Sequence, residues 1–276
     1  MSVSLASDTS TKVSWLGLHR FLVKDVRKLI YARLTLLERI MVEKAHGIDT
    51  KFRKKKSLIC SLAAREGHLG ILQWARENGC TMDEWTVCAA AAQGGHLAIL
   101  QWARANGCPW NEQTCAGAAL GGHLEVLQWA RENGCPWNGN TCLYAAQKGH
   151  LSTLQWAREN GCPWNAETCR VAAYGGHLEV LQWARANGFP WDGNTCSYAA
   201  EEGHLDVLQW ARANGCPWDE STCSHAAFGG HLEILQWARA NGCPWDKRTC
   251  LNAASGGHLD VLQWARANGC PSSDDE

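Results

Sequence analysis

One short unit is repeated along this chain at a nearly constant period, and that period limits the folds open to it. The tripeptide Gly-His-Leu recurs eight times, first after 28 residues and then six times after 27. A unit this short cannot enclose a hydrophobic core alone, whereas stacked copies bury one continuous core. The sequence therefore predicts a solenoid of eight units, marked by His68, His96, His123, His150, His177, His204, His231 and His258.

Each unit divides into two short helices. In residues 114–140, a Cys and two Ala residues recur at helical spacing, and Gly121-Gly122 then predicts the end of the first helix. The second helix begins at His123 and ends at the Asn-Gly pair that closes at Gly134. The residue before the first helix is Asn or Asp, both preferred N-caps. These predicted caps are Asn111, Asp192, Asp219 and Asp246.

The run Thr-x-x-x-Ala-Ala-x-x-Gly-His-Leu-Glu-Val-Leu, followed by a glycine stop, resembles the ankyrin repeat over roughly residues 55–270. The segment GHLEVLQWARENG, residues 122–134, carries the resemblance most clearly. The stretch from Gly134 to Thr141 is about five residues shorter than in a standard ankyrin unit, so we expect the β-hairpin fingers to be missing or reduced to a Cys-Pro-Trp turn. The resemblance implies an all-α, right-handed solenoid of about eight repeats whose shorter first helices line a concave, partner-binding surface.

The ends of the chain differ from the repeats. Residues 1–54 are predicted to form an N-terminal helical cap with a basic linker, because their apolar pattern fits a helical pair covering the first repeat. An independent effector module is the alternative. The repeat array is assigned to residues 55–270, and residues 271–276 form an acidic tail.

The 15 cysteines invite a redox or metal-binding interpretation. Most units hold two Cys seven residues apart, but Phe189 replaces one of them while Cys196 remains, which disfavours a disulfide at that spacing. Structural zinc sites use close Cys and His pairs. No close Cys pair occurs, and the one close His pair is His225 and His231. We therefore predict packed thiols, structural histidines at the helix turn, no metal and no cofactor.

Tryptophan is unusually frequent, with 16 residues against four Tyr and four Phe. Eight lie in the second helices and six in the Pro-Trp turns. A row of exposed Trp can bind sugars or bases. The second-helix Trp occupy positions where ankyrin repeats carry core residues, so we predict that they pack between repeats. A glycan or small-ligand binder remains the alternative.

Charge is divided unevenly along the chain. Residues 1–56 hold 13 basic and 5 acidic residues, whereas residues 57–276 hold 13 and 22. The basic run at residues 51–56 is predicted to be a solvated linker, so nucleic acid is not the expected partner. A nuclear address or, as an alternative function, a nucleic-acid contact is the other interpretation. No secretory signal and no membrane segment is recognisable, which predicts a cytoplasmic location with a nuclear one left open. No catalytic constellation is found, so we predict no enzyme and no small-molecule substrate.

The units differ from one another mainly at four positions of the first helix, those of Gln113, Ala116, Gly117 and Leu120, which point away from the core. Three of the four Tyr residues lie at these positions, and Tyr and Arg are enriched at protein interfaces. We therefore predict a monomeric, non-catalytic scaffold or adaptor that binds a protein partner on this face. The predicted site comprises Leu143, Tyr144, Arg170, Tyr174, Tyr198, Glu201, His225 and Phe228.

Overall fold

The computed structural model describes residues 56–77, 85–164 and 167–271. Within these ranges it contains 16 helices and no strand, arranged as eight consecutive helix pairs. The first helices of the pairs are α4 (Lys56–Arg65), α6 (Thr86–Gln93), α8 (Glu112–Gly121), α10 (Gly139–Gln147), α12 (Glu167–Tyr174), α14 (Gly193–Glu201), α16 (Glu220–Phe228) and α18 (Lys247–Ser255). The second helices are α5 (Leu69–Glu77), α7 (Leu97–Ala105), α9 (Leu124–Glu132), α11 (Leu151–Glu159), α13 (Leu178–Ala186), α15 (Leu205–Ala213), α17 (Leu232–Ala240) and α19 (Leu259–Ala267).

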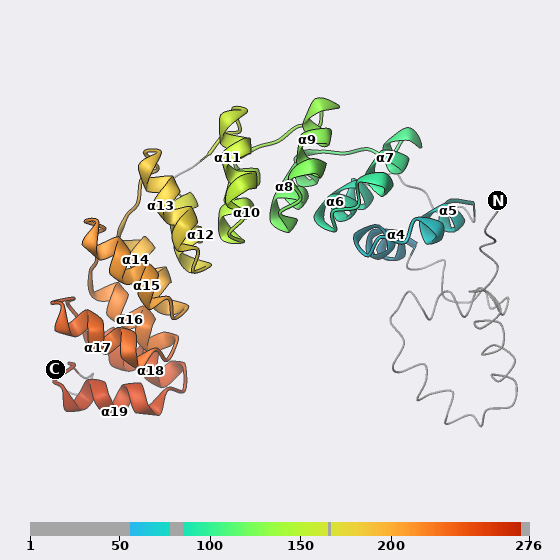
Figure 1. Cartoon of the computed structure of the whole chain (residues 1–276). Coiled ribbons are helices and arrows are strands. Elements are labelled where there is room, and N and C mark those ends of the chain that lie inside the picture. The colour runs from blue at the N-terminus through green and yellow to red at the C-terminus, as the bar shows by residue number, and fades with distance from the viewer. Residues whose placement is uncertain (1–55, 78–84, 165–166, 272–276) are drawn as a thin grey trace, which may run out of the picture.

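The all-α repeat solenoid predicted from the sequence is confirmed. The pairs follow one another along an arc, and the first helices lie on its inner side (Figure 1). Each first helix packs against the first helices of the neighbouring pairs and against its own second helix. The predicted cap and linker, residues 1–54, and residues 272–276 of the predicted tail lie outside the described residues.

The helix boundaries follow from the capping residues. The side chain of Asn111 accepts a hydrogen bond from the backbone N–H of Gln113 at 3.0 Å, so the predicted N-cap is confirmed. Asp192, Asp219 and Asp246 make the same contact in their own units. At the other end of α8, Gly122 has a φ of 73°, a left-handed conformation that glycine adopts without steric cost.

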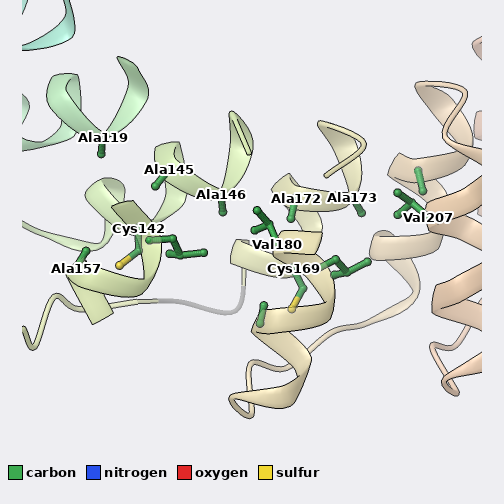
Figure 2. Close-up of a cluster of buried hydrophobic side chains, with 14 of the residues drawn as sticks. Ala119, Cys142, Ala145, Ala146, Ala157, Cys169, Ala172, Ala173, Val180 and Val207 are labelled. Atoms are coloured by element: carbon green, nitrogen blue, oxygen red, sulfur yellow. The ribbon is translucent and has the colours of Figure 1, made fainter. Parts of the chain in front are cut away.

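The small residues of the first helices explain the curvature of the arc. Paired alanines such as Ala145 and Ala146 of α10 and Ala172 and Ala173 of α12 are fully buried (Figure 2). Such short side chains let the first helices approach closely. The second helices present larger residues, among them a fully buried Leu in most units, and burying each Leu contributes about 2 kcal/mol. Closer spacing on the first-helix side makes that side concave.

The repeated histidine joins five of the units to the unit before them. The Nε2 atom of His123 lies 3.1 Å from the carbonyl oxygen of Gln93 in α6, and His150 makes the same contact with Leu120 at 3.2 Å. The neutral ring carries its N–H on Nε2 in order to donate here. The prediction that this histidine satisfies backbone groups is confirmed, with the carbonyl supplied by the preceding unit.

The tryptophans form a packed ladder across the unit junctions. In the turn before α10, the Trp137 ring is covered on one side by the Arg131 guanidinium, 4.2 Å from its centroid, and meets the Trp156 ring edge-on at 5.9 Å. Arg131 also donates a hydrogen bond to the carbonyl of Cys135. The same arrangement recurs at Trp110, Trp191, Trp218 and Trp245.

None of the 14 described cysteines forms a disulfide, and all are buried. The cysteines that contact each other lie 20 residues apart in the sequence, not seven as in the spacing within the Cys pairs of the sequence. The Cys115 thiol points at the carbonyl of Cys135 at 3.9 Å, and the Cys135 thiol at the carbonyl of Asn111 at 3.5 Å. A hydrogen bond between the two thiols raises the pKa of Cys115 and lowers that of Cys135. Cys169 faces Phe189 instead, and burial raises its pKa to about 12.

Candidate partner-binding surface

The inner side of the arc presents side chains from the variable positions of the first helices. Tyr174 at the end of α12 is 40% exposed, and Phe228 at the end of α16 is 47% exposed. Both are among the few large apolar side chains exposed in the described part of the chain. They follow the buried alanine pairs directly, because a helix that buries two adjacent residues turns the next one outward.

Five of the predicted residues form one continuous series of contacts across α12, α14 and α16. The Arg170 guanidinium lies 5.7 Å from the centre of the Tyr198 ring. Tyr198 meets the Tyr174 ring edge-on at 6.0 Å and the His225 ring edge-on at 6.1 Å. His225 in turn lies 3.6 Å from the Glu201 carboxylate. Together with Phe228, one helical turn beyond His225, these residues are called the aromatic patch below.

Carboxylates surround the aromatic patch. Glu167 pairs with Arg170 at 2.5 Å, so its charge is already neutralised. The Tyr174 hydroxyl donates to the Glu202 carboxylate, and this hydrogen bond, followed by the negative charge itself, raises the pKa of Tyr174. Stacked or edge-on aromatic rings held by polar neighbours lose little conformational entropy when a partner binds.

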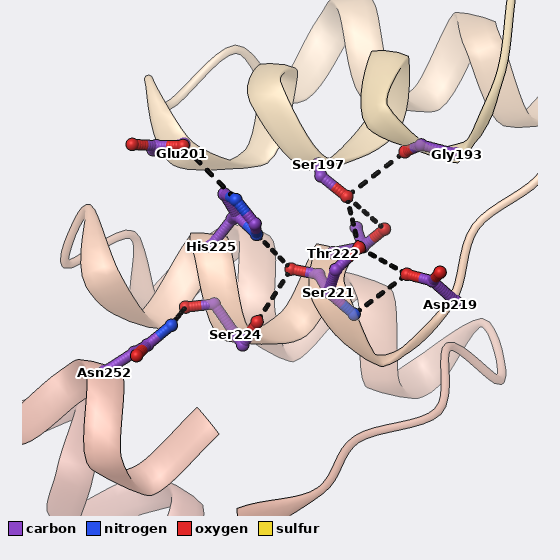
Figure 3. A network of polar contacts seen from close by, with 9 residues as sticks. All are labelled: Gly193, Ser197, Glu201, Asp219, Ser221, Thr222, Ser224, His225 and Asn252. Carbon is purple, nitrogen blue, oxygen red and sulfur yellow. Dashed lines mark hydrogen bonds and ion pairs between the residues drawn. The ribbon is translucent and has the colours of Figure 1, made fainter. Parts of the chain in front are cut away.

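A polar network beneath the patch fixes the orientation of His225 (Figure 3). Its Nδ1 atom lies 2.7 Å from the carbonyl of Ser221, so Nδ1 carries the N–H and Nε2 faces Glu201. The Ser221 hydroxyl donates to Asp219, which lowers the pKa of Asp219. Ser197 of α14 contacts the Ser221 hydroxyl at 2.8 Å, linking the two helices. The ring of His225 is therefore held in place from below.

Two predicted residues lie outside the aromatic patch. Leu143 is half-buried at the position where Ser197 and Ser224 are buried between neighbouring first helices. Tyr144 contributes instead to a groove of about 420 Å³ shared with α4, α6 and α8. The contacts that define the aromatic patch include neither residue, so the predicted site divides into a patch and a separate residue pair on α10.

The sequence analysis missed this groove. Two small residues in consecutive units, Ala90 and Gly117, could have indicated it. They occupy the repeat position that Tyr144 and Tyr198 occupy in other units. Aromatic side chains at the variable positions indicate a patch, whereas a groove on a surface of repeats arises where side chains are missing.

No group of three or more His, Cys, Asp or Glu side chains suited to a metal ion occurs in the described part of the chain. Likewise, none of the described helices is both long and apolar enough to cross a membrane.

The family model for ankyrin repeats (many copies) matches residues 196–239. Among solved structures, the crystal structure of the human ASB11 ankyrin repeat domain is similar at 19% sequence identity, with a TM-score of 0.48, over 57% of this chain and 84% of that chain. No curated protein matches the sequence. Ankyrin repeats are generally protein–protein interaction modules and are typically not catalytic. The matched residues carry the unit that recurs along the array, so the units of this chain are similar to ankyrin repeats.

Proposed function

We propose that this protein is a non-catalytic scaffold or adaptor whose protein partner docks on the aromatic patch of α12, α14 and α16. The observation that carries the proposal is the unbroken series of contacts from Arg170 through Tyr198 to Glu201. Buried interfaces draw most of their binding energy from a few Tyr, Trp and Arg residues at their centre. The patch offers two Tyr, one Arg and the exposed Phe228 on one face.

The tryptophans support this choice over a glycan-binding function. Carbohydrate and base recognition needs an open ring face. The turn Trp rings instead carry an Arg on one face and meet a second ring at the edge, as at Trp137. All are partly buried against the core.

The test is an alanine scan of two faces against a partner isolated by pull-down and identified by mass spectrometry. We expect Tyr174→Ala and Phe228→Ala each to weaken binding by about 2 kcal/mol, roughly thirtyfold, with the melting temperature nearly unchanged because both rings are exposed. Glu125→Ala and Glu179→Ala, on exposed second-helix positions, serve as matched controls. Loss of affinity in the controls and full affinity in the patch variants would place the partner on the other face.

A further inference from the structure

A second candidate site lies on the same inner side, in the first half of the array. The groove of about 420 Å³ crosses α4, α6 and α8 and ends at Tyr144 of α10. Its volume falls within the range of about 300–1,000 Å³ typical of ligand pockets. The aromatic patch begins at α12, so the two sites share no residue.

The groove exists because two consecutive units lack a side chain that most others have. At the position of Tyr198, the eight units carry in order Leu62, Ala90, Gly117, Tyr144, Val171, Tyr198, His225 and Asn252. Ala90 and Gly117 therefore form a floor between larger neighbours. Gly117 also brings α8 close to α6, since a Cβ added there would lie 2.7 Å from the carbonyl oxygen of Ala89. The backbone itself closes the bottom of the groove.

The walls of the groove are apolar and aromatic. Trp85, which is 42% exposed, stands at one side, and Leu62, Leu120 and Tyr144 complete the rim. A wall of this composition with a floor of Ala and Gly matches a large apolar side chain in shape and chemistry.

Arg65 is the one charged side chain among the described residues that line the groove. It is exposed, and it makes no ion pair with any residue in the described part of the chain. A guanidinium matches a carboxylate geometrically and by charge. The aromatic patch, in contrast, is bordered by glutamates, so the two sites favour partner segments of opposite charge.

We propose that the groove binds an acidic peptide segment of a partner protein. A bulky apolar side chain of that segment sits over Ala90 and Gly117, against Trp85, and a carboxylate nearby pairs with Arg65. This proposal does not depend on the partner of the aromatic patch, because it rests on different residues and a different charge.

The test selects short peptides from a random displayed library on the intact protein and measures the affinity of synthetic copies. Ala90→Tyr fills the groove with a side chain that the equivalent positions of α10 and α14 already carry, so the variant should fold. We expect enriched peptides to pair Asp or Glu with Trp, Phe, Leu or Met. Ala90→Tyr and Arg65→Glu should each weaken binding at least about tenfold. Arg266→Glu makes the same charge change at an exposed position of α19, outside both sites, and should leave the affinity unchanged.

Several results would overturn the proposal. Selected peptides without carboxylates would contradict the pairing with Arg65. If the peptides bind the Ala90→Tyr variant as tightly as the original protein, their binding site is not the groove but another surface, for instance the basic residues 1–56. A concentration-dependent dimer abolished by Ala90→Tyr would make a second copy the occupant. If Ala90→Tyr lowers the melting temperature, Trp85→Ala replaces it as the groove variant, and retained peptide affinity in Trp85→Ala again contradicts the proposal.

Discussion

His123 and its counterparts show how one side chain per unit holds the array together. The His123 ring lies between two glycines, Gly121 of its own unit and Gly95 of the preceding unit. A Cβ on Gly95 would lie 2.5 Å from the Nδ1 atom of His123, and a Cβ on Gly121 would lie 2.5 Å from its Cδ2 atom. Gly95 is therefore needed for two reasons: its backbone adopts a left-handed conformation, and a side chain there would occupy the space of the histidine ring. The sequence analysis identified this histidine as structural but could not name its partner, because the carbonyl it contacts lies 30 residues earlier.

This histidine ladder predicts a pH dependence of stability. Burial lowers the pKa of His123 and of His177 below the ordinary value of 6.5. Below that pH the unfolded chain binds more protons than the folded one, so stability must fall as the pH drops. We expect the urea midpoint of unfolding to decrease steadily from about pH 7 to about pH 5.5. His225→Asn removes a histidine outside the ladder and should keep this slope; a midpoint that does not change with pH would contradict the mechanism.

At the scale of the helix, the first helices combine two tasks on opposite sides. Their alanine pairs set the distance to the neighbouring units, and their variable positions form the inner surface. The sequence predicted both, since eight copies of one signal repeat the same caps, glycines and apolar spacing. It did not predict the pairing of Cys115 with Cys135 or the groove at Gly117, because such contacts depend on how adjacent helices pack rather than on spacing within one helix.

The two sides of a first helix should respond oppositely to enlargement. Ala118 of α8 is fully buried, whereas Ala90 of α6 lines the groove. Ala118→Leu forces extra methyl groups between packed helices and should destabilise the protein by about 1–3 kcal/mol in urea unfolding. Ala90→Tyr should change the unfolding free energy by less than about 0.5 kcal/mol. Equal losses in both variants would show that the groove is not open space.

At the scale of the whole molecule, the main contacts of each described unit are with its neighbours, so stability is approximately a sum of unit and junction terms. The first and last units then each have one face without a repeat to cover it. The division into residues 1–54, 55–270 and 271–276 remains a prediction, as does the role of the first segment as a cap.

Removing residues 1–50 tests the cap. If the segment covers the first repeat, its deletion should lower the melting temperature and cause aggregation, because an apolar repeat face becomes exposed. Light scattering after size-exclusion chromatography and thermal unfolding measure both effects. Removal of residues 272–276 is the control and should change neither. A truncated protein that stays monomeric with its original melting temperature would identify the segment as an independent module.

The tryptophan ladder gives the array an optical signal at its joints. Each edge-on pair, such as Trp137 with Trp156 at 5.9 Å, joins the turn that precedes one helix pair to the second helix of that pair. Indoles this close couple electronically, so near-ultraviolet circular dichroism reports the joints, while far-ultraviolet dichroism reports the helices. At one joint Phe189 lies against Trp164 at 3.8 Å, which alters the chromophore arrangement there. Loosening between units with the helices intact should therefore be visible without any introduced label.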